Sequence, residues 1–186
     1  MAYYDLNQQR KQEIENNLLA LMQETPYDQI PVKALTDNLQ IARKTFYHYF
    51  HNKQACLESL MDRLILESNL NLIALPPNAT PQDMYTERLL FWIRKKDFLN
   101  TIHRNNLSAL FVERAMLYIR QEDNSIQSRL STKSLISDED VLYFYISGQV
   151  HLMMKWCREG FTRPLEEMVQ ISLRLALEPL LRPEEE

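Results

Sequence analysis

The chain contains little glycine, with two residues in 186. Leu, Met, Glu, Gln, Lys and Arg are abundant instead, and these residues favour helices. Extensive sheet with tight turns is unexpected in such a sequence. The composition therefore favours an all-α fold.

Cysteine and long apolar runs are also scarce. Cys56 and Cys157 are far apart in unrelated contexts, and we find no secretory signal, so we expect reduced thiols in a cytoplasmic protein. No apolar run approaches the roughly 20 residues of a membrane span. His48, His51 and Cys56 fit no closed zinc pattern, so we predict neither a metal nor a cofactor.

Motifs typical of enzymes are missing as well. The sequence contains no glycine-rich phosphate loop, no nucleophile elbow and no clustered acid–base pair. We therefore expect a protein that is not an enzyme.

The formal net charge of −4 argues against a protein that coats polyanions without selectivity. The positions of the charged residues are more informative than the net charge. Residues 1–60 hold six Lys or Arg and seven acids, but residues 32–52 hold three of these cations, two histidines and one acid. A local basic patch on an acidic body is typical of a protein that reads a nucleic-acid sequence.

Helical spacing of apolar residues predicts a three-helix N-terminal unit followed by a longer helical part. The first helix should run from about residue 5 to 24 and end before Pro26, because proline restrains the residue before it. Asn52 is a suitable N-cap for a fourth helix. We predict further helices at 81–95, 96–104, 105–121, 137–159 and 164–181, and a loop at 122–137. The predicted domains are a helix-turn-helix DNA-binding domain at 1–55 and a helical ligand-binding and dimerisation domain at 56–186.

The run RKTFYHYFHNK, residues 43–53, carries the strongest functional signal. It follows a short helix and a tight turn, which is the layout of a helix-turn-helix DNA reader. The first turn of its helix should reach base edges, and other polar side chains should contact phosphates. The predicted contacts with double-stranded DNA are Lys33, Arg43, Lys44, Thr45, Tyr47, His48, Tyr49 and Lys53. Phe46 and Phe50 are assigned to the core.

On these residues the chain resembles the TetR family of bacterial transcription regulators. The resemblance covers about residues 8–60, and its most specific part is Thr45-Phe46-Tyr47-x-x-Phe50-x-x-Lys53. It implies an all-helical dimer with three-helix DNA heads and a bundle that dimerises through the last two helices. Two residues depart from the family pattern: Gln40 replaces the turn glycine, and Ala42 replaces the serine N-cap of the recognition helix.

The C-terminal half also resembles a subgroup that includes regulators of dihydroxyacetone kinase operons. The similarity lies in Tyr143-Phe144-Tyr145-x-Ser147-Gly148, Trp156 and Pro164-x-Glu166-Glu167-Met168. One member type acts as a coactivator with a partner protein. The resemblance therefore leaves two hypotheses open: a dimeric repressor that binds a pseudo-palindromic operator, and a coactivator or adaptor that works through a protein partner.

The predicted last two helices carry more apolar surface than one side can bury, which indicates a homodimer interface. Aromatic and methionine side chains in this half either line a pocket for a small effector or simply fill the core. The candidate ligand-binding residues are Trp92, His103, Phe111, Tyr143, Met153 and Trp156. His103 and the adjacent Arg104 are either polar anchors of such a pocket or surface residues.

Overall fold

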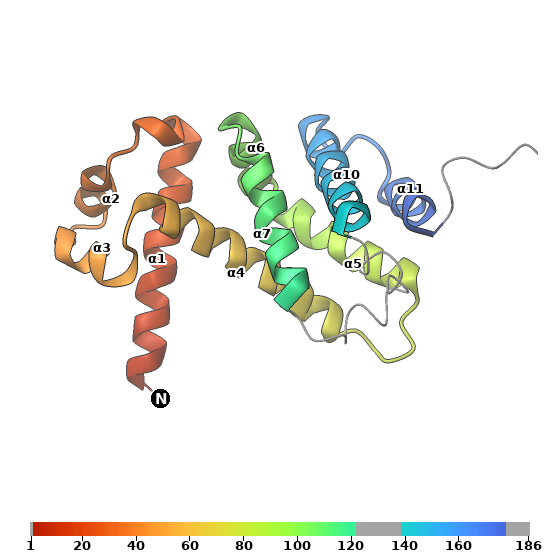
Figure 1. Cartoon of the computed structure of the whole chain (residues 1–186), viewed down its shortest axis with the longest axis horizontal. Helices are drawn as coiled ribbons and strands as arrows, with labels where there is room; N and C mark the ends of the chain where they lie inside the picture. Colours follow the sequence, from red (N-terminus) through yellow and green to blue (C-terminus); the bar gives the residue numbers. More distant parts are fainter. Residues whose placement is uncertain (1, 122–138, 178–186) are drawn as a thin grey trace, which may run out of the picture.

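A computed structural model describes residues 2–121 and 139–177 (Figure 1). Every regular element in these two ranges is a helix, so the predicted all-α fold is confirmed. The helices are α1 (Ala2–Glu24), η1 (Tyr27–Gln29), α2 (Val32–Asn38), α3 (Arg43–Tyr49), α4 (Lys53–Ile73), α5 (Pro81–Arg94), α6 (Lys96–Arg104), α7 (Ser108–Gln121), α10 (Glu139–Arg158) and α11 (Leu165–Leu177). The predicted loop at 122–137 and the end of the last predicted helix, 178–181, lie outside the described residues.

Local sequence signals fix where several helices begin. Asn52 caps α4, because its side chain accepts a hydrogen bond from the backbone N–H of Ala55 at 2.7 Å. Thr80 and Asp83 form a capping box at the start of α5, in which each side chain bonds the other residue's backbone N–H. Ala42 offers no such bond to α3, so the recognition helix begins without a side-chain cap.

Three helices end in the same Schellman geometry, in which one residue adopts a positive φ and an apolar residue follows it. The positive φ belongs to Gln40 after α2 (53°), Asn106 after α6 (55°) and Gly160 after α10 (70°), where the following Phe161 also has a positive φ (56°). In each case the following N–H bonds back to the helix; after α2, for example, the N–H of Ile41 donates to Thr36 O at 3.0 Å. Gly160 thus lies at the end of α10, close to the predicted end of that helix at residue 159. Gln40 adopts the conformation that a glycine would hold without strain.

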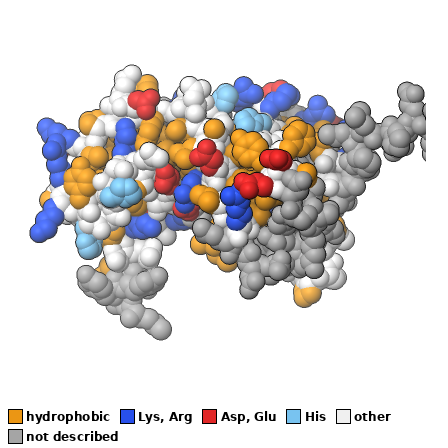
Figure 2. Space-filling view, viewed as in Figure 1, with side chains coloured by type: hydrophobic (Ala, Val, Ile, Leu, Met, Phe, Trp, Pro, Cys, Tyr) orange, Lys and Arg blue, Asp and Glu red, His pale blue; other side chains and the backbone are white. Residues whose placement is uncertain are grey.

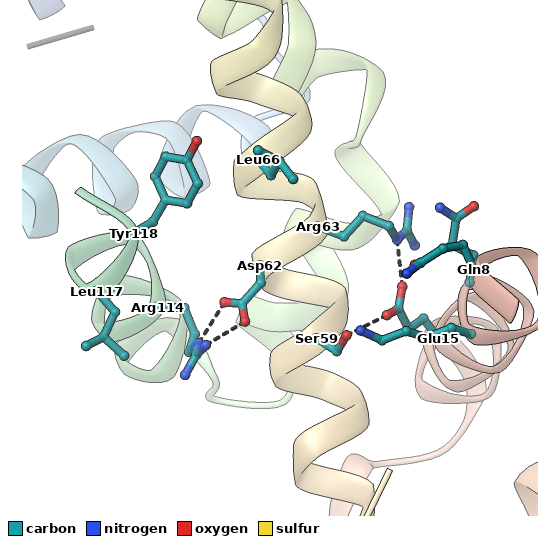
Figure 3. Close-up of a pocket in the computed structure, with 11 residues that line it drawn as sticks. Gln8, Glu15, Ser59, Asp62, Arg63, Leu66, Arg114, Leu117 and Tyr118 are labelled. Atoms are coloured by element: carbon teal, nitrogen blue, oxygen red, sulfur yellow. Dashed lines mark hydrogen bonds and ion pairs between the residues drawn. The ribbon is translucent and has the colours of Figure 1, made fainter. Parts of the chain in front are cut away.

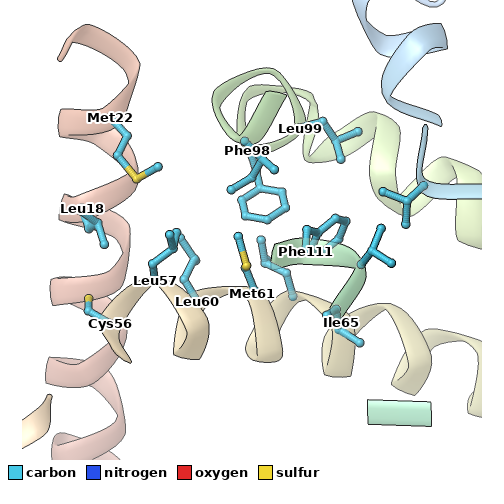
Figure 4. Packing of buried hydrophobic residues seen from close by; sticks show 14 of the residues in the cluster. Leu18, Met22, Cys56, Leu57, Leu60, Met61, Ile65, Phe98, Leu99 and Phe111 are labelled. Atoms are coloured by element: carbon cyan, nitrogen blue, oxygen red, sulfur yellow. The ribbon is translucent and has the colours of Figure 1, made fainter. Parts of the chain in front are cut away.

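The head, which we define as α1, η1, α2, α3 and the first two turns of α4, shares one hydrophobic cluster with the bundle formed by the rest of α4 and the later helices. Helix α4 carries this cluster from one part to the other (Figure 4). Its side chains Leu57, Leu60 and Met61 are each at most 1% exposed. They lie between Leu18 and Met22 of α1 and aromatic residues of α6 and α7. The cluster therefore crosses the predicted domain boundary at residue 55.

A second cluster joins α5 to α11 and the C-terminal end of α10. It contains Trp156, whose indole N–H donates to Arg163 O at 2.9 Å and whose ring lies 5.0 Å from that of Phe161. α11 packs on α5, and α10 packs on α6 and α7. Within the described ranges, no helix combines the length and the apolar character that crossing a bilayer requires.

Candidate nucleic-acid interface

The recognition helix α3 is held by its aromatic residues and presents its cations outward. Phe46 is fully buried and Phe50 is 4% exposed, with ring centroids 5.8 Å apart, so both belong to the core as predicted. Arg43 and Lys44, in the first turn of α3, are exposed. No described residue forms a hydrogen bond or an ion pair with either of their charged groups. The leading edge of α3 is therefore free to meet a ligand.

The remaining predicted contacts of this region differ in accessibility. Lys33 and His48 are exposed, and Tyr47 is 54% exposed with its ring edge-on to Phe46 at 5.4 Å. Thr45 and Tyr49 are half-buried. Figure 2 shows Lys and Arg side chains gathered at the end of the molecule where α2 and α3 lie, with histidines close by. The structure thus gathers a basic and aromatic surface around the exposed side of α3.

Lys53 lies differently from the residues of α3. Its Nζ donates to Tyr27 O at 2.5 Å and Ile30 O at 2.8 Å, and it lies 4.2 Å from the centre of the Tyr27 ring. Burial lowers the pKa of this ammonium group, and the nearby Asp28 partly opposes the effect. Two of its three N–H groups therefore fasten α4 to the segment around η1. A phosphate contact by Lys53 stays a prediction, and it would have to use the third.

Two polar contacts that hold α2 in place were not predicted from the sequence. Asn17 of α1 is 7% exposed, and its side-chain amide donates to Leu35 O of α2 at 3.0 Å. Its carbonyl oxygen accepts a hydrogen bond from Asn38 at the end of α2. A buried asparagine at a helix–helix contact was the available signal, because buried polar groups need partners. These bonds set the position of α2 and, through the turn at Gln40, that of α3.

The bundle holds the head at the end of α6. Arg104 donates to Gln23 O near the end of α1 at 2.6 Å, and the side chain of Asn105 accepts from the N–H of Tyr27 at 2.6 Å. His103 is half-buried, with its Nε2 3.3 Å from a guanidinium nitrogen of Arg158. His103 and Arg104 occupy the last turn of α6. The Arg104 side chain thus bonds to the head, and a role for either residue in a ligand pocket stays a prediction.

The six candidate ligand-binding residues lie in different surroundings. Trp92 and Phe111 are buried together with ring centroids 5.4 Å apart, and Met153 belongs to the same cluster. Trp156 belongs to the second cluster, and Tyr143 is 52% exposed on α10. The structure brings Trp92, Phe111 and Met153 into one packed core, while His103, Tyr143 and Trp156 lie apart from it.

Among the described residues, no group of three or more His, Cys, Asp or Glu side chains is arranged to hold a metal ion. Of the three residues considered for zinc, His48 and His51 are exposed and Cys56 is fully buried. Burial raises the pKa of the Cys56 thiol, and the nearby Glu15 adds to this effect.

Comparison with known proteins agrees with this geometry. The family model described as "Bacterial regulatory proteins, tetR family" matches residues 18–60, which include α2, the turn and all of α3. Residues 18–60 of this chain are thus similar to this family of regulators. The C-terminal subgroup remains a resemblance only.

Curated relatives match part of this chain. The HTH-type transcriptional regulators EthR of Mycobacterium tuberculosis (strains CDC 1551 / Oshkosh and ATCC 25618 / H37Rv) and of Mycobacterium bovis are 35% identical to this chain over 63 residues. The match covers 34% of this chain and 29% of each relative. It thus spans less than a third of the length of these regulators.

Proposed function

We propose that this chain is a DNA-binding transcriptional regulator that reads a pseudo-palindromic operator as a homodimer. The observation that carries the proposal is the exposed leading edge of α3, where Arg43 and Lys44 have no partner among the described residues while Phe46 anchors the helix. Guanidinium and ammonium groups at this place in a recognition helix can donate to guanine O6 and N7. The match of the family model to residues 18–60 supports the same reading.

The binding experiment uses the full chain and a random duplex pool. Repeated selection should enrich one sequence with two related half-sites about one helical turn, or a multiple of it, apart. Affinity for the selected duplex should fall steeply as salt rises, because each phosphate contact releases counterions. Enrichment of no sequence, or binding that ignores both sequence and salt, would overturn the proposal.

The homodimer is supported by an apolar face on α10. Phe144 is 70% exposed, and Val141, three residues earlier on the same side of the helix, is 39% exposed. A Cβ built at Gly148, one turn further along, meets no atom within 4 Å, so another helix can approach closely there. A two-fold contact between such faces would bury them in both copies. Sedimentation should therefore show a dimer that Phe144→Glu weakens and Leu70→Glu, at an exposed leucine of α4, leaves intact.

We further propose that the regulator is a repressor, that a small ligand or a protein partner relieves repression, and that the chain catalyses no reaction. A ligand relieves repression only if it binds one arrangement of the two heads better than the other. A reporter gene placed behind the selected operator tests the sign of regulation. Higher reporter output in the presence of the protein would contradict a repressor.

The alternative is a coactivator or adaptor that acts through a protein partner. The apolar face of α10 supports this alternative as much as it supports a homodimer. A foreign protein could cover Phe144 just as a second copy of this chain could. Capture from a lysate with the tagged chain, compared with enrichment of genomic DNA by the same chain, separates the two functions. A stoichiometric foreign subunit without enriched DNA would favour the adaptor.

A further inference from the structure

A groove lies along α4 between α1 and α7, where the head meets the bundle (Figure 3). Its volume is about 410 Å³, which lies in the range of small-molecule sites. Lys11 and Glu15 of α1, Asp62 and Leu66 of α4, and Arg114 and Leu117 of α7 are among the residues that line it. The six candidate ligand-binding residues are not part of this lining. The groove is therefore a separate place where a ligand could bind.

The carboxylates of the groove already have partners. Glu15 is 1% exposed and accepts hydrogen bonds from Ser59 Oγ at 2.7 Å and from Arg63 Nε at 2.6 Å. Asp62 accepts two bonds from Arg114, from Nε at 2.8 Å and from a terminal nitrogen at 2.5 Å. These pairs neutralise both acids and both guanidinium groups (Figure 3). Among the described residues that line the groove, every carboxylate is therefore already paired with a cation.

Lys11 differs from the other two cations of the groove. No described carboxylate lies within ion-pair distance of its ammonium group, which instead lies 5.8 Å from the centre of the Phe50 ring. The side chain is half-buried, and the exposed amide side chains of Gln8 and Gln12 flank it on α1. The net uncommitted charge of the lining is therefore positive and sits at the α1 side.

The opposite side of the groove carries two exposed leucines beside the Asp62–Arg114 ion pair. Leu66 of α4 is 42% exposed and Leu117 of α7 is 38% exposed. Figure 3 shows Leu66 on the central helix α4 and Leu117 on α7, the helix on the far side from α1. The two leucines suit the apolar part of a ligand, and the Lys11 ammonium group suits an anionic group at the other end of the same molecule.

We propose that this groove binds an amphipathic carboxylate. The carboxylate lies against the Lys11 ammonium group and the neighbouring amides, and the apolar body covers Leu66 and Leu117. An amphipathic cation is disfavoured because both acids are already paired and Lys11 repels it. Such a ligand contacts α1 of the head and α7 of the bundle together, so its binding should alter DNA affinity; only this last consequence rests on the proposed function.

The test uses the full chain without DNA and octanoate as the probe, with octanol and octylammonium as uncharged and cationic controls. Methyl NMR spectra follow the leucine resonances during each titration. Octanoate should shift Leu66 and Leu117 saturably and bind about fivefold or more tightly than either control, a ratio in the range of an exposed ion pair. Lys11→Gln should remove this preference for the carboxylate.

Arg10→Gln is the matched control, because Arg10 neighbours Lys11 in sequence but pairs with Glu13 at 2.8 Å and does not line the groove. It should leave octanoate affinity unchanged. Leu117→Asn, at a partly exposed position, should weaken octanoate and octanol alike. Absence of saturable shifts, equal binding by Lys11→Gln, or shifts centred on the Trp92 and Phe111 core would overturn the proposal. None of these outcomes depends on whether the chain binds DNA.

Discussion

Glu15 of α1 and Arg63 of α4 form a 2.6 Å ion pair in which the carboxylate is 1% exposed and the guanidinium group 19% exposed. Arg63 also donates to Glu67 at 2.9 Å and to Asn16 at 2.8 Å. A carboxylate so far from water is tolerated only with its partners in place. The pair therefore fixes the first helix of the head on the helix that head and bundle share.

Arg63→Met should destabilise the fold by about 3 kcal/mol, because it leaves the Glu15 carboxylate buried without its counter-charge. The double variant Glu15→Leu/Arg63→Met should recover much of that loss, since no buried charge remains. Urea unfolding measures both. Arg94→Met is the control, because Arg94 pairs with Glu87 at 3.1 Å while 55% exposed, and it should cost little. Equal losses for Arg63→Met and Arg94→Met would contradict a structural role for the buried pair.

Lys53→Met should lower the free energy of unfolding by about 1–3 kcal/mol, because the side chain loses two hydrogen bonds from a charged donor to Tyr27 O and Ile30 O. Lys44→Met should leave stability unchanged, since Lys44 is exposed and bonds to no described residue. Thermal unfolding compares the two variants. If Lys53→Met weakens DNA binding with unchanged stability, the residue acts mainly as a phosphate contact.

Gln40→Gly should stabilise the chain by about 1 kcal/mol, because φ is +53° at this position and glycine adopts that conformation without steric cost. The control is Gln29→Gly at an exposed residue of η1, for which the structure records no positive φ. Chemical denaturation reports both changes. A loss of stability in Gln40→Gly would mean that the glutamine side chain makes a contribution larger than the backbone strain.

Arg43→Ala and Lys44→Ala should each reduce affinity for the selected operator by about 1–3 kcal/mol and relax the preference for one or more base pairs. Both residues are exposed at the start of α3, so the fold should remain intact. Fluorescence anisotropy with the operator and with scrambled duplexes measures the loss of discrimination. Arg94→Ala, on α5, is the control. Unchanged discrimination in both recognition-helix variants would place base reading elsewhere.

The two thiols should react slowly with a disulfide reagent near pH 8 in the folded protein and rapidly after unfolding. Burial raises the pKa of both Cys56 and Cys157, so the reactive thiolate is rarer than in an unfolded chain. Cys56, which is fully buried, should be the slower. Single Cys→Ser variants assign the two rates. A rapid reaction of one thiol in the native protein would contradict this burial.

The helices and their ends could largely be predicted because their signals are local. Asn52 and the Thr80–Asp83 pair cap helices through bonds that reach only three residues. The positive φ expected at a turn glycine is present at Gln40. The buried positions of Phe46 and Phe50 likewise follow from the spacing of aromatic residues on α3.

Contacts between distant residues could not be predicted in this way. Lys53 lies in the first turn of a helix, where an outward direction is the simplest expectation, yet it turns to carbonyls 23 and 26 residues earlier. Arg104 bonds a carbonyl 81 residues earlier, which no local pattern indicates. The sequence named Trp92 and Trp156 together as residues of a pocket or of the core, but only the packing of α5, α10 and α11 assigns them to different clusters.

Helix α4 supplies part of the hydrophobic interior on both sides of the predicted boundary. A fragment that stopped at residue 55 would keep Ile14 and Leu18 but lose Leu57, Leu60 and Met61, which belong to the same cluster. The apolar face of α1 in this fragment would then be exposed to water, which is unfavourable. A fragment of the head that folds on its own would therefore need most of α4. This helix cannot be divided between head and bundle without exposing the interior of one of them.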